Sequence, residues 1–268
     1  MSMQNITKSI TTAQILKKKD IEKITMLTAY DALMAKIFDG EVDMILVGDS
    51  LQMSFFGDLD TLSSSLDKMI YHTQAVCNGV KKSLVICDMP FGSTTIPKLA
   101  LKSAIRIYKE TKAQAVKLEI GFEGLKSIEM LVKNGIAVMV HIGLKPQFIR
   151  SDGGYKVKGK TQESVESLIK LAQEIEQKGA FSILLEGVKA EAAQQITQSV
   201  KIPVIGIGSG VNVDGQVLVW SDAFGFFEEF RPKFVRQYLK GAELLRQSVR
   251  QYVEDVKNGS FPSERESY

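Results

Sequence analysis

The hydrophobic residues of this chain are grouped into short runs, separated by stretches in which apolar positions recur every three or four residues. Most runs are rich in β-branched residues. A short, continuous apolar run of this kind is typical of a strand buried on both faces of a parallel sheet. Eight runs qualify as strands, and they span residues 24–30, 43–49, 83–88, 115–119, 137–141, 181–186, 203–208 and 216–220.

Most of the intervening stretches have helical periodicity. In residues 31–38, for example, Leu33, Ile37 and Phe38 would share one face of a helix. Similar patterns cover residues 98–109, 124–133, 162–178 and 191–198. Eight strand–helix units in 268 residues favour an α/β fold, a closed (βα)8 barrel of the TIM type that forms a single domain over residues 1–268. An open, doubly wound parallel sheet is the alternative, because periodicity alone cannot show closure.

Two further segments interrupt or extend this rhythm. Residues 51–65 form a long connection with several large apolar side chains, which we interpret as a lid or an interface loop. A C-terminal helical extension is expected from about residue 232, and its apolar stripe needs a partner surface on the barrel or on another subunit. That stripe consists of Phe234, Val235, Tyr238, Leu239 and Leu244.

Five of the apolar runs end in a side chain that can bind a metal ion or move a proton. In a parallel βα array the carboxyl ends of all strands lie at the same end of the sheet, where the active sites of barrels are built. Side chains that are far apart in sequence are therefore expected to converge on one pocket, which indicates an enzyme. These residues are Asp49, Asp88, Glu119, His141 and Glu186.

Asp49 and Asp88 end neighbouring strands, so their carboxylates should lie side by side. Two like charges held a few ångströms apart repel each other unless a cation or a shared proton compensates. With Glu119 as a third oxygen donor, the sequence predicts a hard divalent cation, and Mg²⁺ suits one or two carboxylates completed by water or substrate oxygens. A single acid after a strand can instead be a helix N-cap, an alternative that applies best to Asp49 followed by Ser50.

Lys117 and Glu119 are two residues apart on one strand and therefore point to the same face. In a barrel interior this places an ammonium group beside a carboxylate. The functional interpretation is that Lys117 binds a substrate carboxylate or the oxygen of an enolate while Glu119 supports the metal. The alternative is a purely structural ion pair.

Glu186 ends an apolar strand, several strands away from the other acids. A carboxylate at the edge of an apolar pocket has a raised pKa, which suits a general base. His141 could donate a hydrogen bond to the substrate or to a neighbouring acid, or could simply be packed. Together the residues predict that Glu186 removes a proton next to the carbonyl of a 2-oxo acid that chelates Mg²⁺, giving an enolate. What the enolate then attacks is not visible from these residues.

Composition mainly excludes classes of protein. The net charge of +3 is small, and we expect the dense basic run at residues 17–19 to lie on a solvated surface, because no nucleic-acid-binding motif accompanies it. Cys77 and Cys87 form neither a metal-ligand spacing nor a disulfide framework, as expected in a reducing cytoplasm. No apolar stretch approaches the ~20 residues that a membrane-spanning helix needs, and residues 1–10 lack the apolar core of a signal peptide. The expectation is a cytoplasmic enzyme with small-molecule substrates and no nucleic-acid or membrane partner.

Nine motifs, in order along the chain, resemble those of the ketopantoate hydroxymethyltransferase family. They are MLTAYD (26–31), GDSL (48–51), DKMIYHT (67–73), DMPFGS (88–93), AVKLE (115–119), HIGLKPQ (141–147), GGYKVKG (153–159), GIGSG (206–210) and DGQVLV (214–219). The resemblance implies a (βα)8 barrel that transfers a hydroxymethyl group from 5,10-methylenetetrahydrofolate to 3-methyl-2-oxobutanoate. The product would be 2-dehydropantoate, an intermediate in pantothenate biosynthesis.

The resemblance also implies roles for individual residues. Asp49 and Asp88 would be the direct Mg²⁺ ligands, with Glu119 a further acid at the metal, and Glu186 would be the base at C3. The oxo acid would be held by Asp49, Ser50, Asp88 and Lys117, whereas the expectation of His141 at the substrate comes from its position at a strand end. Family members are commonly decamers built from dimers, so a homo-oligomer is expected.

The chain departs from the family pattern at several positions. Gln52 and Ile120 stand where the family usually has glycine, close to the metal site, and Ser221 stands where it usually has histidine. Two other interpretations therefore stay open. One is a Mg²⁺-dependent carbon–carbon lyase or mutase that acts on another 2-oxo acid. The other is a catalytically silent barrel that serves as a binding module.

Overall fold

Eight parallel strands form a closed barrel in which each strand pairs with the next along the chain and the last pairs with the first. The closed (βα)8 prediction is therefore confirmed, and the open sheet is wrong. Each predicted strand is present, with ends that differ by no more than two residues. The strands are β1(Ile24–Thr28), β2(Met44–Val47), β3(Leu84–Asp88), β4(Ala115–Glu119), β5(Val138–Gly143), β6(Ser182–Glu186), β7(Val204–Ile207) and β8(Gly215–Leu218).

This computed structural model describes residues 9–228 and 231–268. The chain divides into two compact units, one that ends at Val219 and contains the barrel, and one that begins at Trp220. Within the described residues, no helix combines the length and apolar character that crossing a membrane requires.

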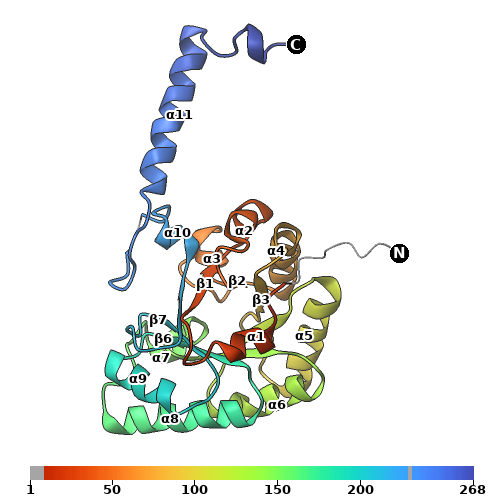
Figure 1. The fold of residues 1–268 in the computed structure, drawn as a ribbon, viewed down its shortest axis with the longest axis vertical. Helices are drawn as coiled ribbons and strands as arrows, with labels where there is room; N and C mark the ends of the chain where they lie inside the picture. Colours follow the sequence, from red (N-terminus) through yellow and green to blue (C-terminus); the bar gives the residue numbers. More distant parts are fainter. Residues whose placement is uncertain (1–8, 229–230) are drawn as a thin grey trace. The chain divides into compact units, whose positions relative to one another are not determined.

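Helices surround the strands of the first unit (Figure 1). Several begin at capping residues that the sequence supplies: the Asp31 side chain accepts hydrogen bonds from two backbone N–H groups of α2, and Ser65 and Thr161 cap α4 and α8. The longer helices are α2(Ala32–Phe38), α4(Leu66–Gly79), α5(Pro97–Glu110), α6(Leu125–Lys133), α8(Gln162–Gln177) and α9(Ala190–Gln198). The short helices α3(Leu51–Ser54) and α7(Ile149–Asp152) follow β2 and β5, at the end of the barrel that carries the candidate site residues.

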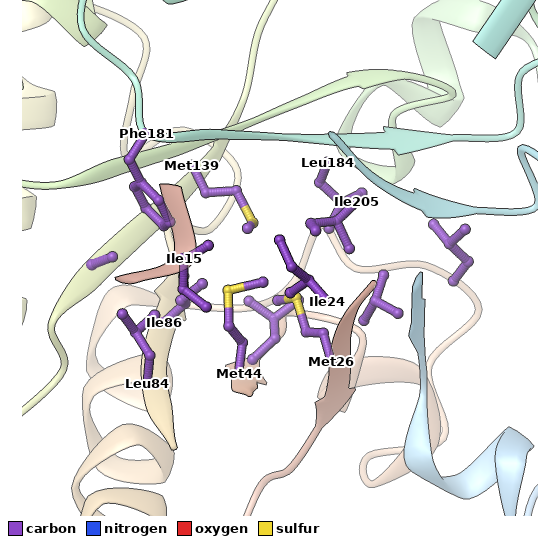
Figure 2. Close-up of a cluster of buried hydrophobic side chains, with 14 residues drawn as sticks. Ile15, Ile24, Met26, Met44, Leu84, Ile86, Met139, Phe181, Leu184 and Ile205 are labelled. Carbon is purple, nitrogen blue, oxygen red and sulfur yellow. The ribbon is translucent and has the colours of Figure 1, made fainter. Parts of the chain in front are cut away.

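A short N-terminal helix, α1(Thr12–Lys17), contributes to the core of the barrel. Its Ile15 is completely buried and packs in one cluster with residues from the beginnings of strands, including Ile24, Met44 and Leu84. Figure 2 shows these side chains directed toward one another. Helix α1 therefore closes the amino-terminal end of the barrel, and the carboxyl end of the strands remains for the site.

The expectation of a solvated basic run at residues 17–19 is wrong for two of its three lysines. Lys17 is exposed. Lys18 Nζ lies 2.7 Å from Asp43 Oδ1, and Lys19 Nζ lies 2.7 Å from Asp214 Oδ2, with the Lys19 side chain only 9% exposed. Both aspartates immediately precede strands, so these ion pairs attach α1 to the barrel.

The second unit contains α10(Trp220–Ala223) and α11(Gly241–Asn258). The predicted helix from about residue 232 is wrong for residues 232–240, which are irregular. The reason is that the chain pairs within the unit with the end of α10 and the residues after it: Tyr238 N–H donates to Ala223 O, and Gly241 N–H, at the start of α11, donates to Phe224 O. Helix α11 nevertheless carries apolar side chains that are 40% to 58% exposed, namely Leu244, Leu245, Val249, Tyr252, Val253 and Val256.

Candidate active site

Strand pairing brings the predicted site residues together at the carboxyl end of the barrel. Asp88, the last residue of β3, lies opposite Lys117 of β4, and Glu119 lies opposite His141 of β5. Glu186, the last residue of β6, lies opposite the end of β5. Residues separated by about a hundred positions in the sequence thus occupy four adjacent strands, as the topology of a parallel barrel requires.

Asp49, Asp88 and Lys117 form a buried ionic cluster. Lys117 Nζ lies 2.6 Å from Asp88 Oδ2, and the same oxygen accepts the backbone N–H of Asp49 at 3.3 Å. None of the three residues is more than 3% exposed. The N-cap alternative for Asp49 is not supported, because α3 begins after Ser50 and no side-chain cap bond is present there.

The electrostatics of this cluster follow from burial and from the balance of charges. Burial raises the pKa of Asp49 well above its ordinary value, the charge of Asp88 raises it further, and Lys117 opposes the rise. Burial also raises the pKa of Asp88, again against Lys117. Burial would lower the pKa of Lys117, but the surrounding carboxylates outweigh it and raise that pKa, so the lysine stays protonated. The single positive charge of Lys117 therefore does not balance the buried carboxylates when they are ionised.

His141 lies between two acids. Its Nδ1 is 3.3 Å from Glu119 Oε1, and its Nε2 is 3.4 Å from Glu186 Oε2. Each ring nitrogen therefore faces a carboxylate oxygen, although neither makes a hydrogen bond in the described residues. Burial would raise the pKa of Glu119, yet His141 and Lys117 lower it overall. Of the alternatives for His141, contact with neighbouring acids is the one that the structure supports.

Glu186 has the properties expected of a general base. Burial raises its pKa to about 7, an effect that His141 opposes and Glu119 reinforces. Its side chain is still 19% exposed, more than those of Asp88, Glu119 or His141, so a ligand at the barrel mouth can reach it. A carboxylate with a pKa near neutrality can both accept and release a proton at physiological pH.

The acids also fit a hard cation. Asp88 Oδ1 and Glu119 Oε1 are buried, and neither has a hydrogen-bond partner among the described residues. In the described residues, no group of three or more His, Cys, Asp or Glu side chains is already arranged to hold a metal ion. This is compatible with Mg²⁺, which takes one or two carboxylates and completes its octahedron with water or substrate oxygens. The ligand set of Asp49, Asp88 and Glu119 stays a prediction.

Two residues at the site were not singled out from the sequence. Gln147 is buried beside the acids, and its Nε2 donates to Asp49 Oδ2 at 2.8 Å. Tyr30 is completely buried, and its hydroxyl lies 2.8 Å from the Oγ of Ser50. Both lie in motifs that carry the family resemblance, which is the one signal that could have drawn attention to them.

The connection after β2, residues 51–65, is held by contacts within itself and by an ion pair to the segment after β5. The side-chain amide of Gln52 donates to Asp58 at 2.7 Å, so this departure from the family pattern fixes the loop instead of pointing at the acids. Arg150 Nη2 lies 3.2 Å from Asp60 Oδ2 and joins the loop to the segment after β5. Phe56 is 53% exposed. These contacts place the connection at the mouth of the barrel, beside the acids.

The barrel is shared with proteins of low sequence identity. A crystal structure of phosphonopyruvate hydrolase in complex with oxalate and Mg²⁺ matches with a TM-score of 0.62 at 13% identity, over 96% of this chain and 93% of that one. A crystal structure of 2,3-dimethylmalate lyase gives a TM-score of 0.56 at 14% identity, over 96% and 91% of the two chains. At such identities the similarity establishes the fold alone.

Relatives of high identity are more informative. The 3-methyl-2-oxobutanoate hydroxymethyltransferase of Wolinella succinogenes is 62% identical over 97% of this chain and 100% of its own length. The enzyme of the same name from Helicobacter pylori is 56% identical over the full length of both chains. The model of the family described as ketopantoate hydroxymethyltransferase matches residues 9–264. The chain therefore belongs to the ketopantoate hydroxymethyltransferase family, as its motifs indicate.

Proposed function

We propose that this enzyme transfers a hydroxymethyl group from 5,10-methylenetetrahydrofolate to 3-methyl-2-oxobutanoate and releases 2-dehydropantoate for pantothenate biosynthesis. The observation that carries the proposal is the Glu186 carboxyl group, which has a pKa near 7 and lies at the mouth of the barrel beside a cluster of acids around Lys117. The names of the close relatives support the choice of acceptor.

In this proposal the site residues have distinct tasks. Lys117 and the Ser50 hydroxyl hold the oxo acid, and Tyr30 orients that hydroxyl. Glu186 removes the proton at C3, and the electron pair of the broken C–H bond forms the new carbon–carbon bond to the one-carbon unit of the folate. Both bonds from that carbon to the folate nitrogens break, water adds its hydroxyl group to the carbon, and tetrahydrofolate leaves with protons on its two nitrogens. His141, in contact with Glu186, stabilises the carboxylate before the proton arrives.

A divalent metal is part of the same proposal. Asp49 and Asp88 would hold Mg²⁺, with Glu119 close by, since Asp88 Oδ1 and Glu119 Oε1 are buried without hydrogen-bond partners among the described residues. A bound Mg²⁺ would supply Lewis-acid stabilisation of the negative charge that develops when the proton leaves. Lys117 contributes to the same stabilisation from the β4 side of the site.

Asp49→Asn combined with Asp88→Asn is expected to abolish the rise in melting temperature that Mg²⁺ produces in the wild-type protein. The variant should fold but melt at a lower temperature than the wild type without metal, because Lys117 loses Asp88 and keeps only Glu119, at 3.8 Å, while the neutral amides remove the repulsion between two buried carboxylates. The effect is measured by thermal unfolding without Mg²⁺ and with about 10 mM Mg²⁺, roughly the excess needed to saturate a weak site. An unchanged metal-induced shift would show that the ion binds elsewhere.

The rate of proton removal is expected to rise with pH and then level off. Glu186 must be deprotonated to act as a base, and its pKa is about 7. The rate should therefore increase about tenfold between pH 6 and pH 8, with the midpoint near neutrality. Initial rates of C3 proton exchange, followed by NMR across this range, measure the profile. A rate that is flat between pH 5 and 8 would point to a base with an ordinary carboxylate pKa.

The proposed reaction is tested directly by proton NMR. Purified protein is incubated with 3-methyl-2-oxobutanoate, Mg²⁺ and 5,10-methylenetetrahydrofolate, and the formation of 2-dehydropantoate is followed. Product that depends on both metal and folate is the expected result. Conversion of the oxo acid without folate would favour the carbon–carbon lyase or mutase, and no conversion by folded, metal-loaded protein would favour the silent barrel.

Assembly into a homo-oligomer belongs to the same proposal. The exposed apolar side chains of α11, including Val249 and Tyr252, support it, because a row of apolar residues on a helix is usually covered by another surface. Light scattering is expected to give a mass that is a multiple of the 29.7 kDa chain, ten chains by family resemblance. A monomer would contradict this part.

The proposal also places the enzyme in the cytoplasm. Two free, buried thiols, those of Cys77 and Cys87, support this location.

A further inference from the structure

Gln147 makes an unusual set of contacts for an uncharged side chain at the barrel mouth. It belongs to the single turn η2(Pro146–Phe148) that follows β5 and is only 4% exposed. Its Nε2 donates to Asp49 Oδ2 at 2.8 Å and to the backbone oxygen of Met89 at 3.0 Å. Its backbone N–H donates to Glu119 Oε2 at 2.9 Å. One residue therefore contacts acids at the ends of two different strands.

The orientation of the Gln147 amide follows from its partners. A side-chain amide has two N–H donors on one atom and an acceptor on the other. Met89 contributes a carbonyl oxygen, which can only accept, so the NH₂ group must face this pair. Both of its donors are then engaged, and the plane of the amide is fixed. Pro146 precedes Gln147 and restricts the backbone as well.

These contacts determine the orientation of the Asp49 and Glu119 carboxylates. When a donor is fixed on one oxygen of a carboxylate, the other oxygen is turned toward the remaining ligand, which is how outer groups orient metal ligands. Glu119 shows the pattern: Oε2 is held by Gln147, while Oε1, which lies 3.3 Å from His141 Nδ1, makes no hydrogen bond in the described residues. Asp88 repeats it, with Oδ2 held by Lys117 and Oδ1 left.

We propose that Gln147 is a positioning residue that fixes the carboxylates of Asp49 and Glu119 for a divalent cation, through its side-chain amide and its backbone N–H respectively. The inference rests on the proposed function insofar as it takes these acids as the metal site. It adds a neutral residue from the loop after β5 that acts through its contacts with these two acids. Its effect should therefore be on metal affinity.

The test is Mg²⁺ binding to the full-length Gln147→Met variant, measured by isothermal titration calorimetry. Methionine keeps the length and approximate volume of the side chain but has no donor, and the backbone N–H to Glu119 is retained. The expected result is that Mg²⁺ binds roughly 10–100-fold more weakly than to the wild-type protein, the usual effect of losing an outer-shell partner.

A matched control separates positioning from general loss of stability. Gln114 also uses its side-chain amide in the barrel, accepting from the backbone N–H of Val85 and donating to Ser9 at the opposite end. Gln114→Met should lower the melting temperature to a similar degree and leave the Mg²⁺ affinity unchanged. If Gln147→Met does not fold, Gln147→Asn takes its place, since it keeps the polar amide but is one methylene too short to reach Asp49.

Each outcome decides the question. Weaker Mg²⁺ binding in the Gln147 variant alone supports the proposal. Equal affinity in that variant and in the wild type, or equal weakening in the Gln114 control, overturns it. Absence of Mg²⁺ binding by the wild-type protein overturns it together with the metal part of the proposed function. The transfer reaction is assayed separately through 2-dehydropantoate formation, so its failure is distinguished from failure of the positioning role.

Discussion

Glu186→Gln is expected to bind 3-methyl-2-oxobutanoate and Mg²⁺ and yet to exchange the C3 proton of the oxo acid about 10²–10⁴-fold more slowly than the wild-type enzyme. Glutamine keeps the volume and a carbonyl oxygen near His141 but cannot accept the proton at neutral pH. The remaining groups that hold the substrate, Lys117 and Ser50, are unchanged. The loss should therefore appear in the rate of proton removal and leave the affinity for the oxo acid nearly intact.

Deuterium exchange at C3, followed by NMR in heavy water, isolates this step because it needs no folate. Calorimetric titration with the oxo acid in the presence of Mg²⁺ shows whether binding survives. Glu191→Gln is the matched control, since this exposed glutamate lies in the first turn of α9 on the outside of the barrel. Exchange at the wild-type rate in the Glu186 variant would assign the base to another group, with Glu119 the next carboxylate in contact with His141.

The barrel could be predicted from the sequence because most of its strands are buried on both faces. β2, β3, β4, β5 and β7 are buried at every position, so their runs are continuously apolar except where a functional group is needed. In a sequence of that kind a polar residue at a strand end stands out. Asp88 and Glu119 were recognisable for this reason, and parallel topology then indicated that they converge.

The errors occurred where local patterns depend on tertiary partners. Residues 232–240 have helical periodicity, but Tyr238 N–H donates to Ala223 O, at the end of α10, and the segment is irregular. Lys18 and Lys19 were predicted to be solvated because the sequence does not show their partners. In the structure they pair with Asp43 and Asp214, which precede β2 and β8. Nothing in the spacing of these residues indicates that they meet.

The site was predictable in its charged members and not in its neutral ones. Gln147 has no charge, and only the geometry of the turn after β5 brings it to Asp49 and Glu119. The role of His141 was undecided for a related reason. Its two contacts depend on the register of β4, β5 and β6, which a sequence pattern does not determine.

Lys117→Met is expected to lower the free energy of unfolding by roughly 3–5 kcal/mol, which is the usual cost of removing one partner from a buried ion pair. The Lys117 side chain is 4% exposed, with its Nζ 2.6 Å from Asp88 Oδ2 and 3.8 Å from Glu119 Oε1. Without it, the buried acids lose their nearest positive charge. For a domain of this size the melting temperature should fall by roughly 6–20 °C in the absence of metal.

Mg²⁺ and pH should both modulate this loss in a predictable direction. If Mg²⁺ binds at these acids it restores part of the missing positive charge, so the metal-induced rise in melting temperature should be larger in the variant than in the wild type.

The pKa values of Asp49 and Asp88 are already raised by burial, and without Lys117 they rise further. A carboxyl group with a raised folded-state pKa costs stability at any pH where the unfolded chain would ionise it, so the deficit should shrink as the pH falls toward about 4, the ordinary pKa of these groups, and should vanish below it. Thermal unfolding at several pH values, with Lys102→Met on the exposed face of α5 as control, measures this dependence. A small deficit that responds neither to pH nor to Mg²⁺ would mean that Lys117 is not what balances the charge of these acids.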